Sequence, residues 1–129
     1  MDLRTKLDTV FSIFIRLRDA DTNGNVRCIS CPRLENWKNI DCGHFIKRGN
    51  TATRYHEKNA NGQCKYCNQG KDGNESNYEI GLLHKYGPEV LEELRQLKHS
   101  TLKLSRSDYL EKIEYYSKAV QKLKKQKGL

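Results

Sequence analysis

Apolar residues recur every three or four positions along the first 20 residues of the chain. This period predicts an amphipathic α-helix over residues 2–19, and the polar cluster at residues 21–25 is typical of the turn that ends such a helix. An apolar stripe of this kind indicates core packing or a dimer seam more often than a ligand site. The stripe comprises Leu3, Leu7, Val10, Phe14 and Leu17, widened by Phe11 and Ile15.

The middle of the chain has no helical period between residues 35 and 63. Residues 40–46 fit a strand, Arg48-Gly49-Asn50 has the composition of a turn, and residues 51–55 hold enough Thr and Tyr for a return strand. We therefore expect a hairpin here. A short helical turn is expected to begin at the last cysteine and to end near Gly70 or Gly73.

Three further helices are expected after residue 74. The first ends at Gly87, the second begins at Pro88, and the third begins at a capping pair of Ser105 and Asp108. Their apolar stripes are Tyr78, Leu82, Leu83 and Tyr86; Val90, Leu91, Leu94 and Leu97; and Leu110, Ile113, Val120 and Leu123. The lysine-rich residues 124–127 are expected to be frayed.

Two Cys-x-x-Cys pairs bracket a 32-residue insert. Four thiolates at this spacing can close a tetrahedral structural zinc site, so Cys28, Cys31, Cys64 and Cys67 are expected to bind one Zn²⁺. The fifth cysteine, Cys42, is expected to face the interior or to pack beside the site, because four thiolates already saturate the metal.

The composition favours such a metal staple. The chain has 129 residues, of which 36% are hydrophobic and 31% charged, so the apolar core must be small. An odd number of cysteines argues against a disulfide framework, and the apolar patch at residues 10–15 is too short to cross a bilayer. We expect a single domain in a reducing cytoplasm: an N-terminal helix at 1–24, a zinc-bound core at 25–74 and a basic helical part at 75–129.

The net charge of +8 is concentrated near the C-terminus, where residues 98–129 carry nine basic and three acidic side chains. This excess is typical of proteins that bind a polyanion. A solvated, lysine-rich helix face is the alternative, and charge alone does not separate the two.

The insert holds residues suited to phosphodiester hydrolysis. His44 can act as a general base, since imidazole titrates near neutral pH, and Asn68 offers a carboxamide oxygen to a hard cation such as Mg²⁺. Basic side chains near them are candidates for contacts with the DNA backbone: Lys47, Arg48, Arg54, His56, Lys65 and Lys71.

The order Cys-x-x-Cys, Gly-His-Phe-Ile, Asn, Cys-x-x-Cys-Asn-x-x-Lys resembles the HNH endonuclease family, in which a ββα-metal hairpin is built on a zinc-bound treble clef. More narrowly, the chain is similar to the phage NinG/Rap recombination proteins. The segments that carry this similarity are RLRDAD at 16–21, CISC at 28–31, DCGHFIKRGNTATRYHEKN at 41–59, QCKYCN at 63–68 and GNESNYEIGLLHKYG at 73–87. The resemblance implies an α+β, mostly helical fold and a structure-specific endonuclease that cleaves branched DNA such as D-loops and Holliday junctions.

By the same resemblance, His44 is the general base, Asn59 orients it and shapes the hairpin, and Asn68 is a ligand of a catalytic Mg²⁺ or Mn²⁺. One departure concerns the residue before the base, which is usually a second metal ligand and here is Gly43. Asp41 is the nearest carboxylate, but in a regular strand it would point away from His44 unless Gly43 permits a bend. His56 is another candidate.

Three functions are therefore open. The first is a metal-dependent endonuclease of phage or prophage origin that acts in the host cytoplasm. The second is a zinc-stapled module that binds branched DNA without cutting it, which the missing ligand at Gly43 favours. The third is a protein-interaction adaptor. A homodimer would suit the two-fold symmetry of a four-way junction.

Overall fold

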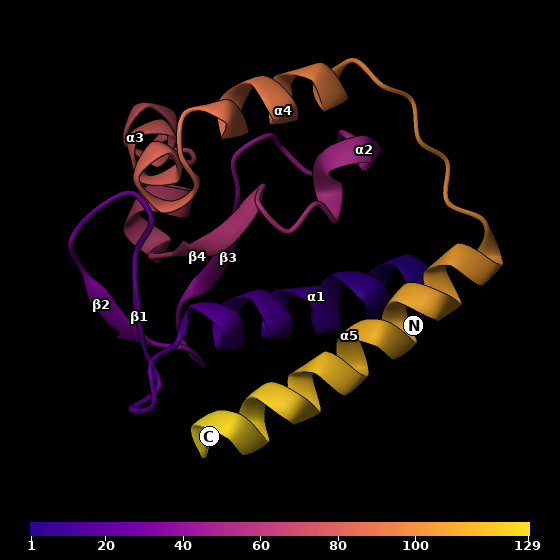
Figure 1. The fold of residues 1–129 in the computed structure, drawn as a ribbon, viewed down its shortest axis with the longest axis horizontal. Coiled ribbons are helices and arrows are strands. Elements are labelled where there is room, and N and C mark those ends of the chain that lie inside the picture. The colour runs from indigo at the N-terminus through magenta and orange to yellow at the C-terminus, as the bar shows by residue number, and fades with distance from the viewer.

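The computed structural model describes residues 1–129 and is an α+β fold with 55% helix (Figure 1). Two small two-stranded sheets are embedded among the helices, and none of the helices is both long and apolar enough to span a membrane. The elements are α1 (Leu3–Asp19), β1 (Asn25–Arg27), β2 (Leu34–Asn36), β3 (Asp41–His44), α2 (Thr51–Arg54), β4 (Ala60–Gln63), the π-helical turn η1 (Tyr66–Gly70), α3 (Glu75–Tyr86), α4 (Glu89–Lys98) and α5 (Arg106–Lys127).

The N-terminal helix α1 forms where the apolar period predicts it. Asp2 caps its first turn by accepting a hydrogen bond from the Thr5 amide at 2.7 Å. Its apolar stripe packs against α5 of the same chain, and the two helices lie side by side (Figure 1). Because α5 covers this stripe, a dimer of this protein would have to use another surface.

The last helix α5 begins with the predicted capping box of Ser105 and Asp108. Two details differ from the sequence expectation. Leu110 is 46% exposed, and Tyr109 packs against the core in its place. The expectation of a frayed tail is also wrong, because the helix continues to Lys127, whose ammonium donates to the carbonyls of Leu17, Arg18 and Ala20 and so caps the end of α1.

The central hairpin pairs β3 with β4, in a register that sets Asp41 opposite Gln63 and His44 opposite Ala60. The predicted return strand at residues 51–55 is therefore wrong. Those residues form the short helix α2, because the Asn50 side chain accepts a hydrogen bond from the Thr53 amide and caps a helical turn. The capping interaction outweighs the strand propensity of the threonines and tyrosine.

Three apolar clusters hold the elements together. The main core joins α1 and α5 to the central hairpin, with Phe11, Ile40 and Tyr116 among its members. A second cluster lies beneath α3 and α4, and the third consists of cysteine side chains. The hydroxyl of the buried Tyr78 donates to the Gly43 carbonyl at 2.7 Å and so ties α3 to the hairpin. The hairpin is thus fixed from both sides.

Candidate metal centre and polar cleft

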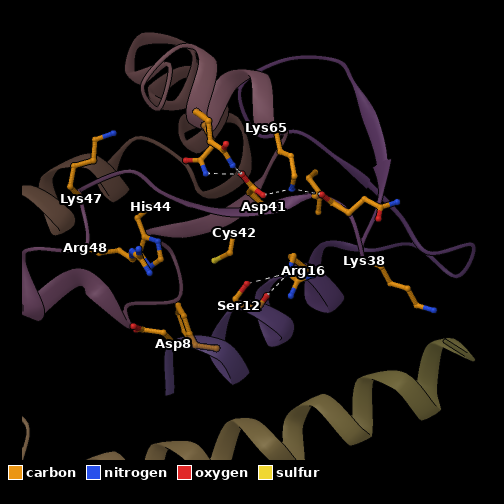
Figure 2. Close-up of a pocket in the computed structure, with 15 residues that line it drawn as sticks. Asp8, Ser12, Arg16, Lys38, Asp41, Cys42, His44, Lys47, Arg48 and Lys65 are labelled. Atoms are coloured by element: carbon orange, nitrogen blue, oxygen red, sulfur yellow. Dashed lines mark hydrogen bonds and ion pairs between the residues drawn. The ribbon is translucent and has the colours of Figure 1, made fainter. Parts of the chain in front are cut away.

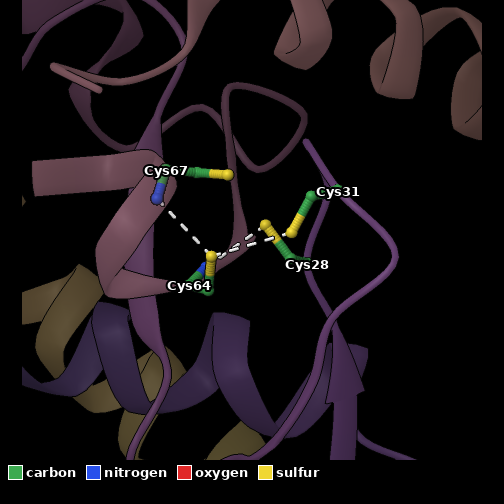
Figure 3. Close-up of side chains that lie close together, drawn as sticks. All are labelled: Cys28, Cys31, Cys64 and Cys67. Atoms are coloured by element: carbon green, nitrogen blue, oxygen red, sulfur yellow. Dashed lines mark hydrogen bonds between the residues drawn. The ribbon is translucent and has the colours of Figure 1, made fainter. Parts of the chain in front are cut away.

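Four cysteine sulfurs converge at one end of the hairpin (Figure 3). The first pair lies in the turn between β1 and β2, and the second pair lies where β4 runs into η1. All four sulfurs lie within 4.8 Å of one another, and Cys31 Sγ is 3.8 Å from Cys64 Sγ. A tetrahedral site with Zn–S bonds of about 2.3 Å has sulfur–sulfur edges of about 3.8 Å, so the four residues fit a structural Zn²⁺.

Backbone and side-chain N–H groups surround these sulfurs. Cys28 Sγ accepts from the amides of Ser30 and Cys64 at 3.4 and 3.2 Å, and Cys67 Sγ accepts from the Asn74 amide at 3.4 Å. Such donors orient thiolate ligands and offset their charge. Four protein ligands leave no open position on the metal, so this centre can hold the fold but has no place for a reacting group. The predicted cysteine set is brought together as expected.

A separate polar cleft, of about 550 Å³, opens between α1 and the central hairpin (Figure 2). Its walls come from α1, from the segment 38–48 and from the start of η1. Five of the lining side chains are Lys or Arg and two are Asp, so the cleft is suited to an anionic ligand. The charged residues that line it are Asp8, Arg16, Lys38, Asp41, Lys47, Arg48 and Lys65.

His44 lies on the wall of this cleft with a defined tautomer. Its Nε2 atom is 2.9 Å from the carbonyl oxygen of Arg54. A carbonyl only accepts, so Nε2 carries the proton and Nδ1 keeps a free lone pair. Burial, together with the positive charges of Arg48 and Arg54, lowers the pKa of His44 to about 4. The imidazole is therefore neutral at pH 7 and can accept a proton at Nδ1.

The carbonyl that holds His44 is itself fixed by an ion pair from α1. The Asp8 carboxylate accepts two hydrogen bonds from the Arg54 guanidinium, at 3.0 and 2.6 Å, and a third from the Tyr55 hydroxyl at 2.6 Å. Arg54 is only 8% exposed and also donates to the Arg48 carbonyl. The guanidinium of Arg54, predicted to contact DNA, is used inside the protein to position α2.

The Asn59 side chain makes no hydrogen bond with His44, contrary to the sequence expectation. The side chain is fully buried, accepts from the Ile46 amide at 2.9 Å, and donates to the carbonyls of Ile46 and Thr53 at 3.0 and 3.1 Å. It therefore links the chain after β3 to α2. The part of the expectation that concerns the shape of the hairpin agrees with these contacts, but the direct orientation of the base does not.

Asp41 and Asn68, the two candidate ligands for a catalytic metal, are in contact. The Asn68 amide donates to Asp41 Oδ2 at 3.0 Å, and Gln69 and Lys65 also donate to this carboxylate, at 2.8 and 2.6 Å. Burial opposes ionisation of Asp41, but these donors outweigh it and lower the pKa of the carboxyl. Asp41 lines the same cleft as His44 but points to the other face of β3, as expected for a regular strand: it pairs with Gln63, whose side chain lies on the face of Gly43, and it contacts η1.

A glycine is needed at position 43 because the Gln63 side chain lies against it, and not because the strand bends there. A Cβ atom at this position would lie 2.0 Å from Gln63 Oε1 and 2.9 Å from Gln63 Cβ. Gln63 is fully buried and is held by donation to Ser30 and to the Gly73 carbonyl. No side chain fits beside it, so a metal ligand cannot occupy position 43 in this fold.

The remaining candidates for DNA contact divide into two groups. Lys47, Arg48 and Lys65 line the cleft. His56 and Lys71 do not: His56 Nε2 lies 3.3 Å from a Glu93 carboxylate oxygen, and the Lys71 ammonium lies 5.5 Å from the centre of the Tyr66 ring. The ring of His56, the other candidate metal ligand, thus pairs with α4 and does not line the cleft that holds Asp41 and Asn68.

Arg16 is a cleft residue that the sequence analysis missed. Its Nε donates to the carbonyl and hydroxyl of Ser12, both at 3.2 Å, and one terminal nitrogen donates to the Trp37 carbonyl at 2.9 Å. No carboxylate pairs with it, so Arg16 holds a fixed positive charge in the cleft (Figure 2). Apart from its place at the start of the RLRDAD segment, the sequence marks it only as one of several basic residues of α1.

Comparison with known proteins identifies the family. The family model described as the bacteriophage lambda NinG protein matches residues 2–126. Proteins named ninG from Escherichia phages 933W and lambda are each 38% identical over 84 residues, and that of Salmonella phage P22 is 37% identical. These alignments cover 63% of this chain and 38% of each relative, so the chain spans about two fifths of their length. No solved structure matches. Because the family model covers almost every residue, the chain belongs to the bacteriophage lambda NinG family.

Proposed function

We propose that this protein is a metal-dependent endonuclease of the HNH type that hydrolyses phosphodiester bonds in branched DNA. One observation carries the proposal: a neutral His44, with a free Nδ1, lines a basic cleft together with the Asp41–Asn68 pair. A general base, a pair of oxygen ligands and positive charge are the three things that hydrolysis of a phosphodiester requires. The four-cysteine centre supports this arrangement as a structural zinc site.

The reacting phosphate would be held by the fixed cation of the cleft. Arg16 is anchored on one edge by Ser12 and Trp37, and its remaining nitrogen can donate to a phosphate oxygen without first breaking an ion pair. Lys47 and Arg48 are exposed, follow His44 closely in the sequence and line the same cleft, so they can bind neighbouring phosphates.

His44 would take the proton of the attacking water at Nδ1. The Arg54 carbonyl accepts a hydrogen bond from Nε2–H throughout and stabilises the imidazolium that forms. With a pKa of about 4, protonation of His44 at pH 7 costs about 4 kcal/mol in the free protein. The negative phosphates of bound DNA oppose the charges of Arg48 and Arg54, so they raise this pKa toward neutrality when the substrate is in place.

Asp41 and Asn68 are the residues that would hold the catalytic Mg²⁺ or Mn²⁺. Their carboxylate and carboxamide oxygens suit a hard cation that keeps several waters, and the exposed Lys65 that now pairs with Asp41 can be displaced. When bound, such a cation neutralises charge on the phosphate and on the leaving oxygen. In its absence Lys65 compensates the Asp41 charge.

The alternative function is a module that binds branched DNA without cutting it. The observation that favours it is the state of Asp41, whose carboxylate is already satisfied by three donors, from Asn68, Gln69 and Lys65. If that arrangement persists in the complex, the cleft binds phosphate but holds no catalytic metal.

A nicking assay decides between the two. The zinc-loaded protein is incubated with labelled D-loops, four-way junctions, flaps and linear duplexes, with Mg²⁺, Mn²⁺ or no added divalent cation. If the protein is an endonuclease, cleavage should depend on the added cation and be strongest on branched substrates, under reducing conditions like those of the host cytoplasm. Binding without cleavage under every condition would support the module instead. Sedimentation of the protein with junction DNA tests the predicted homodimer.

A further inference from the structure

A second basic cleft, of about 360 Å³, lies on the other side of the loop that follows His44. Its walls are this loop, residues 45–50, and the C-terminal end of α4. Phe45 and Ile46 form its apolar part, and four basic side chains line it: Lys47, Arg95, Lys98 and His99. The proposed reaction uses only Lys47 from this set, so the second cleft is otherwise unassigned.

The basic groups of this cleft are either unpaired or held in exposed ion pairs. Lys47 is of the second kind, because its ammonium lies 3.6 Å from an Asp72 carboxylate oxygen and donates to the Asp72 carbonyl at 3.0 Å. The side chains of Lys98 and His99 make no hydrogen bond or ion pair within the protein, and both residues are exposed. Arg95 pairs with Glu79 at 3.3 Å, but its side chain is 53% exposed, and exposed ion pairs are weak enough to exchange for a phosphate. Glu75 is the only acidic residue that lines the cleft.

The two clefts form one continuous surface. Lys47 lines both of them, with a side chain that is 66% exposed. The Asn50 amide donates to the Lys98 carbonyl at 2.5 Å, so the loop between the clefts is tied to the end of α4. The distance from the His44 wall to the cations of α4 is therefore fixed by the fold.

From these observations we infer that the second cleft binds the sugar–phosphate backbone of DNA, at a segment next to the one that enters the first cleft. Two separated cation clusters, joined by a basic loop, match a ligand with repeating phosphates better than a single free phosphate. The inference rests on the proposed function and deepens it: the loop 47–50 lies between two backbone segments, as a branched substrate would present them.

The test is the salt dependence of DNA binding. The zinc-loaded full chain carrying His44→Ala is titrated with a fluorescent three-way fork over a range of NaCl concentrations, without added Mg²⁺. Arg95→Gln with Lys98→Gln removes one paired and one free cation from the second cleft. Each lost phosphate contact lowers the slope of log K against log[NaCl] by about 0.9, so the pair is expected to lower it by about 1–2.

A matched control removes the same charges elsewhere. Lys118→Gln with Lys122→Gln also takes one cation from an exposed ion pair, here with Glu114, and one exposed lysine, both on α5. Helix α5 lies on the far side of α1 from α4 (Figure 1). The control is expected to change the slope by less than about 0.5. Excess inorganic phosphate should compete weakly, because it offers one contact and not a chain of them.

The outcomes separate this inference from the proposed function. An unchanged slope in the α4 variant, or an equal loss in the α5 control, overturns the second backbone site even if the wild type nicks DNA. If the α4 variant loses slope and affinity while the wild type cleaves no substrate, the second site stands and the endonuclease does not. Strong competition by inorganic phosphate would show a simple anion site and also overturn the inference.

Discussion

Replacing Asn59 by alanine should destabilise the protein strongly, because this side chain holds the loop behind His44 and not the histidine itself. Truncation removes the acceptor of the buried Ile46 amide and the donor to the Ile46 carbonyl. The Thr53 carbonyl, by contrast, keeps the His56 amide at 3.1 Å as a donor. Two orphaned groups at about 1–3 kcal/mol each give a loss of about 2–6 kcal/mol, a large part of a typical domain stability of about 5–15 kcal/mol.

The assay is urea unfolding of the zinc-loaded protein followed by circular dichroism. The matched control is Asn77→Ala, an exposed asparagine whose amide makes one hydrogen bond, to Asn74 at 3.1 Å. Its loss should stay within about 0.5 kcal/mol, as is usual for surface positions.

The comparison of stability with activity decides the role of Asn59. If Asn59→Ala unfolds within about 1 kcal/mol of the wild type but loses DNA cleavage, the side chain acts on the reacting groups and the structural reading is refuted. If both properties fall together, and the residual folded fraction accounts for the residual activity, its role is to position the loop.

Three further results are expected. Gly43→Ala should lower stability by about 1–3 kcal/mol in a thermal melt, since its Cβ would lie 2.0 Å from Gln63 Oε1. The control Gly49→Ala should not lower stability, because no atom lies within 4 Å of its Cβ. Equal melting temperatures for the two variants would show that the Gln63 side chain moves aside at no cost. Removing zinc with a chelator, or Cys64→Ser, should abolish cooperative unfolding, and an apoprotein that melts like the wild type would exclude the metal as a staple. Between pH 7 and pH 4 the free energy of unfolding of the wild type should fall by about 3 kcal/mol relative to that of His44→Gln. The reason is that the pKa of His44 is about 4 in the folded protein and about 6.5 in the unfolded chain, so the unfolded chain binds the proton first as the pH falls. Parallel pH curves for the two proteins would contradict a buried, neutral ring.

Features encoded by local periodicity or spacing were predictable from the sequence. The stripe of α1, the capping box of α5 and the four converging cysteines all follow from short-range patterns. Residues 51–55 were mispredicted because their strand propensity is real but weaker than the cap that Asn50 supplies. Local propensity cannot weigh such a cap against pairing with a distant strand.

The composition of the cleft depends on contacts between distant segments, which no local pattern records. Arg16 reaches the cleft from α1, and Asp8 fixes Arg54 across 46 positions of the chain. Likewise, Gly43 makes physical sense only once Gln63 is seen beside it. The sequence resemblance could thus propose His44 and Asn68, but not the groups that set their charge and orientation.

The central claim is that Nδ1 of His44 activates the water that attacks DNA. The most direct test is single-turnover nicking of a saturating D-loop by the zinc-loaded wild type and by His44→Ala, with Mg²⁺ present and DNA affinity measured alongside. The account predicts that the variant nicks about 10²–10⁴-fold more slowly, as expected for loss of a general base, while its affinity changes less than about twofold. A variant that nicks at the wild-type rate would contradict it.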